Sequence, residues 1–445
     1  MTRTGWLALA ILLATALLPA RAGFVRDAEI ERLLADYSRP LLLAADLNPE
    51  TVNIGLISAK SLNAFVAGGQ NMFFHTGLIT EADEPNMIIG VIAHEIGHIT
   101  GGHLSRTDEA VSASQGPAMI ATILGLGSII AGAPDVGMAL IAGGAQVAGR
   151  SFLSYSRAQE ASADITALRL LEATRQSPRG IINMMETLAE QEVLNEVSQD
   201  PYARSHPLSR ARVNAYVEGA SKSPFMDAQD SDALQFRHDM AKAKLYGFLD
   251  HPQLALRRFA DAPDSPPALY AHAVAYHRLA ELPKAIELVD KLLVQFPDNP
   301  WIHELKGQIY YESGYAAKGL ASYERSVALV PDEPLLLIGL ATCQIGVGSQ
   351  GGAAARAINQ KAEKNLRHAL RLDPQSNSAW FQLAKAYGQL EKTAYANWAM
   401  AEYYALQKNP DARKYARRAL KALPRRSTEF LRARDIMSIE FPSRR

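Results

Sequence analysis

The chain has 445 residues, which is too long for one hydrophobic core and predicts two domains. Its apolar content of 48% and charged content of 21% are those of ordinary globular proteins. Lys and Arg together number 46, as do Asp and Glu, so no net charge draws the chain to nucleic acid or to anionic lipid. We therefore expect no nucleic-acid partner.

The first 22 residues predict a secretory signal peptide. Arg3 precedes an uncharged run from Trp6 to Leu18, and Ala20 and Ala22 fit the small-residue pattern of a cleavage site. At about 1.5 Å per residue the run makes a helix of roughly 20 Å, which is short against a hydrocarbon core of about 30 Å. We therefore expect export with cleavage after Ala22, and the alternative is a retained membrane anchor.

Residues from about 23 to 80 mix helical and extended patterns. Helical periodicity near Ala28–Tyr37 gives way to short strand-like runs at Val52–Ile57, Ala64–Val66 and Met72–Phe74. Gly68-Gly69 separates the last two runs, as expected of a hairpin or a bulge. This part of the chain predicts a small sheet beside helices.

A buried helix is predicted from Glu84 to about Gly101. Pro85 suits its first turn, and the glycines at 101 and 102 suit its end. The stretch from Ile88 to Ala93 carries no polar side chain, so whatever follows it on the same helix is expected to be buried as well.

The helix carries the pattern His-Glu-x-x-His. His94 and His98 are four residues apart, so a helix places both imidazoles on one face, and Glu95 lies next to the first. Two imidazoles and a carboxylate in a buried helix are costly unless a metal binds them. The pattern is that of a metalloprotease, with two zinc ligands and a general base.

Residues 110–134 carry no charge. The segments Met119–Ala133 and Val136–Gly149 predict two short helices, the first about 22 Å long and therefore short for a membrane span. They either fold back on the catalytic domain or insert partly into a membrane surface, so 119–149 is also a candidate for peripheral membrane contact.

A catalytic zinc site has three protein ligands and a water, so one ligand is missing from the motif. His103 follows closely, but on a continuous helix it points away from His98. Glu160 lies in an Ala-rich, apolar helical stretch, and Asp164 is one turn further on the same face, where it could hydrogen-bond a ligand histidine. From spacing alone, exposed helix charges explain Glu160 and Asp164 equally well.

Helix pairs repeat beyond the acidic, turn-rich stretch Asp227–Asp232, where we expect a domain boundary. Small residues recur every 34 positions at Ala273, Gly307 and Ala341, which is the tetratricopeptide period. Ala384 follows after 43 residues, which predicts an insertion near 348–355. We expect domains over 23–230 and 233–430, the second a tetratricopeptide-repeat solenoid, with an unrelated helical bundle as the alternative.

Together these motifs resemble the HtpX and CaaX-prenyl-protease family of zincins. The resemblance rests on His94–His98, Ser156–Asp164 and Asn63–Leu78 and covers roughly residues 50–215. It implies an α+β, mostly α, fold: a zincin-type metalloprotease domain with a small edge sheet, followed by the α-helical repeats. It also implies that Asn63–Leu78 is an edge strand to which an extended substrate adds.

The resemblance assigns the remaining site residues. Glu160 becomes the third Zn²⁺ ligand, and Asp164 an acid that steadies the site. The segment Ser205–Arg210 matches one in which a histidine, here His206, occupies the open position of zinc and holds the enzyme latent. Glu95 would take the proton of the zinc-bound water.

With its predicted export signal and tetratricopeptide repeats, the chain resembles the periplasmic members of this family in particular. These imply protein substrates, namely outer-membrane β-barrel precursors and their assembly machinery. Two alternatives stay open: an adapter or chaperone whose zinc site is structural or vestigial, and a membrane-embedded peptidase.

Overall fold

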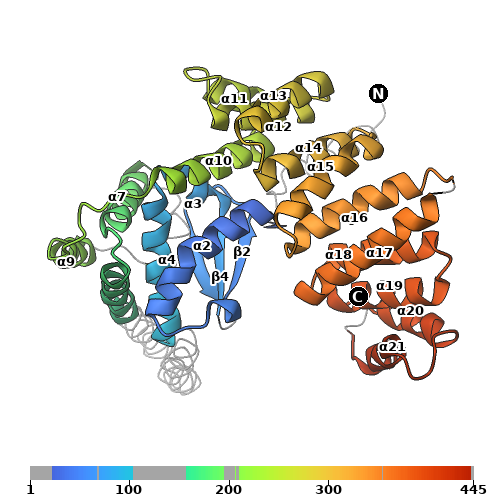
Figure 1. The fold of residues 1–445 in the computed structure, drawn as a ribbon. Helices are drawn as coiled ribbons and strands as arrows, with labels where there is room; N and C mark the ends of the chain where they lie inside the picture. Colours follow the sequence, from blue (N-terminus) through green and yellow to red (C-terminus); the bar gives the residue numbers. More distant parts are fainter. Residues whose placement is uncertain are drawn as a thin grey trace, which may run out of the picture. The chain divides into compact units, whose positions relative to one another are not determined.

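A computed structural model describes residues 23–67, 70–103, 157–194, 206, 210–352 and 354–441 (Figure 1). The signal peptide expected over 1–22 and the helices expected over 119–149 lie outside these residues. The chain divides into two compact units. The N-terminal unit runs from Ile30 to Asp239 and includes Met1–Arg26, and the C-terminal unit runs from Met240 to Arg445 and includes Asp27–Glu29.

The N-terminal unit contains a four-stranded sheet of order β1-β2-β4-β3. Only β2 and β4 are parallel, and the other two neighbouring pairs are antiparallel. On β4, Met72 and Phe74 are fully buried whereas the residues between and beside them are not, which is the period of two of a strand with one buried face. The strands are β1 (Phe24–Val25), β2 (Asn53–Ile57), β3 (Ala64–Ala67) and β4 (Asn71–His75).

The predicted hairpin of β3 and β4 is confirmed, but the predicted edge is only half right. Among the described strands, β3 lies at the edge, whereas β4 pairs with β3 on one side and with β2 on the other. The parallel partner of β4 is β2, which lies 18 residues earlier in the chain and pairs, for example, Asn53 with Asn71. No local sequence pattern predicts this pairing.

The helices of the N-terminal unit bury apolar faces around this sheet. In α2 (Ala28–Ala44) the buried positions Ile30, Leu33, Leu34 and Tyr37 have helical spacing. A short helix, α3 (Thr76–Glu81), follows β4 directly.

The predicted motif helix is α4 (Pro85–Thr100), and its residues 85–97 are buried. It packs against α7 (Arg179–Leu194), where Gly180 N–H donates to Asn86 Oδ1 at 2.8 Å. It also approaches the helical residues 157–173 so closely that a Cβ on Gly97 would lie 2.8 Å from the backbone of Ala163. A residue without a side chain at 97 therefore allows the close approach of two site-bearing helices.

The compact units divide inside α10 (Asp232–Leu249), and the acidic stretch Asp227–Asp232 belongs to the N-terminal unit. There Asp230 Oδ2 accepts the N–H of Asn86 at 2.8 Å, in the first turn of α4. His238 Nε2–H donates to Ala82 O at 2.8 Å. The two contacts join residues 144 and 156 positions apart, so no local sequence pattern reveals them.

The C-terminal unit is built from helix pairs with the predicted 34-residue spacing. The predicted small positions fall on the first helix of each pair, and Ala273 and Ala341 are fully buried. At the remaining small position, a Cβ on Gly307 would lie 2.6 Å from the Tyr323 ring, so the close packing of α14 and α15 requires glycine there. The helices are α11 (Pro252–Arg258), α12 (Pro266–Arg278), α13 (Leu282–Gln295), α14 (Pro300–Glu312), α15 (Ala316–Leu329), α16 (Pro334–Gly348), α17 (Ala355–Leu372), α18 (Asn377–Gln389), α19 (Thr393–Leu406), α20 (Asp411–Leu420) and α21 (Thr428–Ser438).

The insertion predicted near 348–355 is the connection between α16 and α17, where Gly351 and Gly352 adopt positive φ angles of 81° and 92°. Of the helices in the described residues, none is both long enough and apolar enough to cross a membrane.

Candidate metal centre

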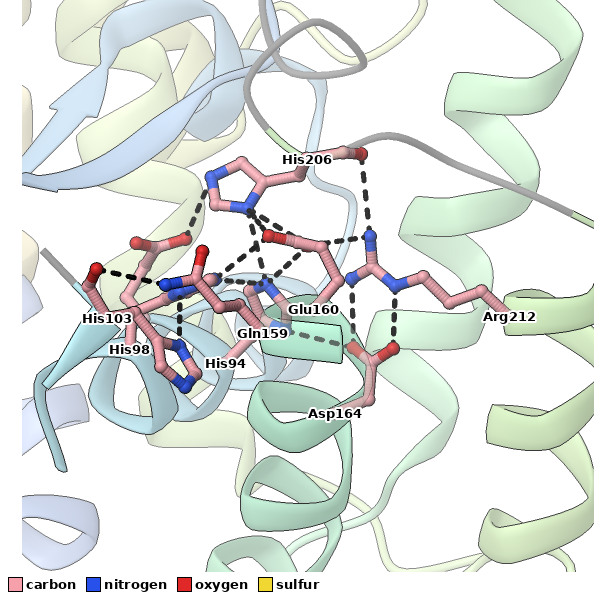
Figure 2. A network of polar contacts seen from close by, with 9 residues as sticks. His94, His98, His103, Gln159, Glu160, Asp164, His206 and Arg212 are labelled. Atoms are coloured by element: carbon pink, nitrogen blue, oxygen red, sulfur yellow. Dashed lines mark hydrogen bonds and ion pairs between the residues drawn. The ribbon is translucent and has the colours of Figure 1, made fainter. Parts of the chain in front are cut away.

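Three segments of the N-terminal unit bring their polar side chains to one point (Figure 2). His94 and His98 come from α4, Glu160 comes from the helical residues 157–173, and His206 joins them from a third segment. One ligand atom from each of the four lies within 4.8 Å of the others. All four are candidates that the sequence analysis names, and each meets the others here.

The distances between these atoms fit a metal. A tetrahedral zinc site with bonds of about 2.0–2.1 Å has its ligand atoms about 3.3 Å apart. His94 Nε2 lies 3.1 Å from His98 Nε2, 3.4 Å from His206 Nδ1 and 3.3 Å from Glu160 Oε2. Glu160 Oε1 lies 3.3 Å from His98 Nε2 and 3.2 Å from His206 Nδ1. These five separations, two to one oxygen of Glu160 and one to the other, bring the four side chains close enough to share a single small cation.

The electrostatics of the cluster also favour a positive charge. Burial lowers the pKa of His94, but hydrogen bonds with Asp164 and Glu160 outweigh it and raise that pKa to about 9. Burial raises the pKa of Glu160, but its contacts with the three histidines hold that pKa well below the usual range. The site therefore keeps its carboxylate ionised and stabilises a cation beside it.

Asp164 lies behind His94, on the side away from the cluster. Its Oδ1 is 3.0 Å from His94 Nδ1. A histidine that offers the Nε2 lone pair to a metal carries its proton on Nδ1, the atom of His94 that faces the Asp164 carboxylate. The contact predicted between Asp164 and a histidine of the motif is therefore present, and Asp164 is not one of the four side chains of the cluster.

Arg212 on α9 (Arg210–Ala220) is a site residue that the sequence analysis missed. Its guanidinium donates to Asp164 through Nε at 2.6 Å and Nη2 at 2.9 Å. Nη1 lies 2.8 Å from Glu160 Oε2 and 3.4 Å from the backbone oxygen of His206. Residues 212, 216 and 220 are buried and have helical spacing, which is a pattern that the sequence contains. The pattern identifies Arg212 only when it is known which face of α9 is buried.

Glu95 is 1% exposed, and neither of its carboxylate oxygens has a hydrogen-bond partner among the described residues. Its nearest polar contact is His206 Nε2, 3.5 Å from Oε1. Glu95 is therefore a buried carboxylate that lies beside the cluster.

His103 is the other candidate for the third ligand, and the geometry does not support it. Its Nδ1 lies 2.9 Å from His98 Nδ1, the ring nitrogen of His98 that points away from the cluster. Glu160, unlike His103, belongs to the group of four side chains that could hold a metal ion.

Comparison with known proteins identifies the N-terminal unit. Residues 25–219 match the model of Peptidase family M48. The chain is similar to the beta-barrel assembly-enhancing protease of Yersinia pestis, at 27% identity over 77% of this chain and 70% of that protein. The protein of the same name in Escherichia coli K12 is 25% identical over 79% of this chain and 70% of its own length. The metalloprotease LoiP of Escherichia coli K12 is 27% identical over 38% of this chain and 63% of its own.

A crystal structure of a thermophilic TPR protein from Thermus thermophilus aligns with 39% of this chain and 100% of its own, at 18% identity and a TM-score of 0.26. The His-Glu-x-x-His motif and all four donors of the cluster lie within the residues that the family model matches. The match to Peptidase family M48 therefore covers the part of the chain that carries the motif and the cluster, residues 25–219.

Proposed function

We propose that this chain is a zinc-dependent endopeptidase of the bacterial periplasm that acts on proteins during outer-membrane β-barrel assembly. The observation that carries the chemical part is the convergence of His94, His98, Glu160 and His206 within 4.8 Å. The location and the substrate class are supported by the names of the similar proteins and by the uncharged N-terminal run of the sequence.

His94, His98 and Glu160 would hold the zinc. Two imidazoles and one carboxylate are a common ligand set of catalytic zinc, and Asp164 behind His94 provides the usual outer partner. Zinc bound there would supply a water of lowered pKa and would polarise the scissile carbonyl.

Glu95 would be the general base. It is adjacent to His94 on α4, and its two oxygens carry no hydrogen bond among the described residues, so they are available to a water and to a peptide nitrogen. Glu95 would take a proton from the attacking water and pass it to the leaving amine.

His206 would hold the enzyme latent. Four protein donors make a closed coordination set, whereas a catalytic zinc keeps one position for water. His206 Nδ1 lies 3.4 Å from His94 Nε2, and its other nitrogen lies 3.5 Å from Glu95, so its ring would occupy the position that the attacking water needs. We therefore propose that His206 leaves the cluster before cleavage.

The C-terminal unit would recruit protein partners. Stacked helix pairs of the tetratricopeptide kind offer extended surfaces on which other proteins dock. The similar proteins of Yersinia pestis and Escherichia coli are named for β-barrel assembly, so we propose barrel precursors and their assembly machinery as the partners.

One observation favours a second candidate, an adapter with a structural zinc. A set of four protein ligands is typical of structural sites. Glu95 argues against the adapter function. Its two oxygens are buried and have no hydrogen-bond partner among the described residues, and a structural zinc site does not require such a carboxylate.

The test compares the wild type with Glu95→Gln, and with Glu172→Gln as a matched control on an exposed face of the helical residues 157–173. Cleavage of an unfolded β-barrel precursor and zinc content are measured for each. We expect equal zinc in all three and cleavage reduced about 10²–10⁴-fold in Glu95→Gln alone. If the wild type and a His206→Ala variant both bind zinc and neither cleaves the precursor, the adapter function is correct.

A further inference from the structure

His98 has a hydrogen-bond partner of its own. Its Nε2 joins the cluster, 3.1 Å from His94 Nε2, while its Nδ1 lies 2.9 Å from His103 Nδ1 (Figure 2). His103 is 5% exposed, and the rings meet nearly edge-on at an interplanar angle of 78°. Two nitrogens at this distance share one proton, so one ring donates and the other accepts.

The direction of the bond follows from metal binding. If His98 offers the Nε2 lone pair to a metal, its proton is on Nδ1, and His103 Nδ1 has to accept it. His103 then carries its own proton on Nε2. The contact therefore favours the one tautomer of His98 that can bind a metal through Nε2.

We infer that His103 is a positioning residue for the metal centre, which fixes the tautomer and the ring orientation of His98 without binding the metal itself. This inference rests on the proposed function, since it takes the cluster to be a metal site. Nothing in the metalloprotease motif requires a histidine at this position.

Two glycines before His103 allow its ring to face His98. A Cβ on Gly101 would lie 2.3 Å from His103 Nε2, so the ring occupies space that only glycine leaves open. Gly102 has a φ of 60°, in the left-handed region that reverses a chain after a helix. These two glycines explain why a residue that a continuous helix would direct away from His98 faces it instead.

A second segment secures His103. Gln159 Nε2 donates to the backbone oxygen of His103 at 3.0 Å. Gln159 immediately precedes Glu160, so the stretch that supplies the third donor also holds the partner of the second.

The two imidazoles of the motif would therefore differ in basicity. His94 Nδ1 lies 3.0 Å from the ionised Asp164, whose pKa lies below its usual range because Arg212 and His94 outweigh its burial. His98 donates to a neutral ring. An anionic partner raises the basicity of a ligand histidine more than a neutral one does, so this arrangement leaves more positive charge on the metal.

The test uses two substitutions of similar shape in the full chain. Asparagine places an amide atom near the position of Nδ1 and can accept the proton of His98, whereas glutamine places its amide nearer Nε2. His103→Asn, His103→Gln and His103→Ala are compared with the wild type and with His251→Ala, an exposed histidine of the C-terminal unit. The readouts are the zinc dissociation constant by chelator competition, the visible spectrum of the cobalt(II)-loaded protein, and thermal unfolding without metal.

We expect zinc affinity about 10–100-fold weaker in His103→Ala and His103→Gln, with an altered cobalt spectrum. His103→Asn should recover most of the affinity and the wild-type spectrum, and His251→Ala should match the wild type. If His103→Ala does not fold, the pair of amide variants decides alone. Equal zinc affinity in the Asn and Gln variants, or wild-type affinity in His103→Ala, overturns the inference.

Failure of the proposed function gives a different result. A wild type that binds zinc and shows the Asn–Gln difference but cleaves no protein disproves the peptidase function and leaves the role of His103 standing. A wild type that binds no zinc disproves both.

Discussion

Arg212 and Asp164 form a buried pair of two hydrogen bonds, with Nε and Nη2 at 2.6 and 2.9 Å from the two carboxylate oxygens. Through Asp164 the arginine fixes His94, and through Nη1 it also contacts Glu160 and the backbone oxygen of His206. One side chain therefore connects two metal-binding candidates, His94 and Glu160, with the segment that carries His206.

Arg212→Leu should destabilise the N-terminal unit strongly. The arginine is 9% exposed, and its loss removes the partner that makes two hydrogen bonds to the buried Asp164, which costs about 3–5 kcal/mol. Arg210→Leu, an exposed neighbour on α9, serves as the control and should change stability by less than about 0.5 kcal/mol. Chemical unfolding of the zinc-free protein measures both, and equal stability of the two variants would show that the pair contributes nothing.

His206→Ala should raise proteolytic activity. If the closed form predominates, removing the histidine releases the fraction of enzyme that is blocked, and we expect a rise of about tenfold or more. Zinc content should stay at the wild-type level, because His94, His98 and Glu160 are unchanged. A fall in activity accompanied by loss of zinc would instead make His206 a required ligand.

The C-terminal unit contains a pH-dependent group. Burial raises the pKa of Glu304 to about 7, against the opposing effect of Lys244. Lys244 Nζ lies 3.8 Å from Glu304 but only 2.8 Å from Asp27, so Glu304 is the more weakly paired carboxylate.

A carboxyl whose pKa is raised on folding stabilises the protein below its unfolded pKa of 4.5, and this contribution is lost as the pH rises through about 7. Glu304→Gln removes the titration. The free energy of unfolding of the variant, relative to the wild type, should therefore increase between pH 5 and pH 8, by up to about 3 kcal/mol. Urea unfolding at both pH values tests this, and a difference that does not change with pH would contradict it.

Local patterns predict much of the fold and of the site. The motif helix and the β3–β4 hairpin follow from hydrophobic periodicity and from the positions of glycine and proline, which are signals of the nearby chain. The repeat domain follows from small residues that recur every 34 positions. His94 and His98 are identifiable because residues four apart lie on one face of a helix, and Glu95 is identifiable because it follows His94 directly.

The remaining contacts depend on which segments pack together. Arg212 lies 48 residues beyond Asp164, and Arg210 is an equally plausible partner until the buried face of α9 is known. A continuous helix would direct His103 away from the site, whereas Gly102 with its positive φ turns the chain back. The parallel pairing of β2 with β4 and the unit boundary inside α10 are likewise long-range properties.

The most direct test of the account is the metal content of the purified chain beside its Glu160→Ala variant, with Glu172→Ala as the control on the same helical stretch. We predict one zinc per chain in the wild type and in Glu172→Ala, and little or none in Glu160→Ala. A wild type without metal, or a Glu160→Ala variant that retains its zinc, would contradict the centre built from two histidines and one glutamate.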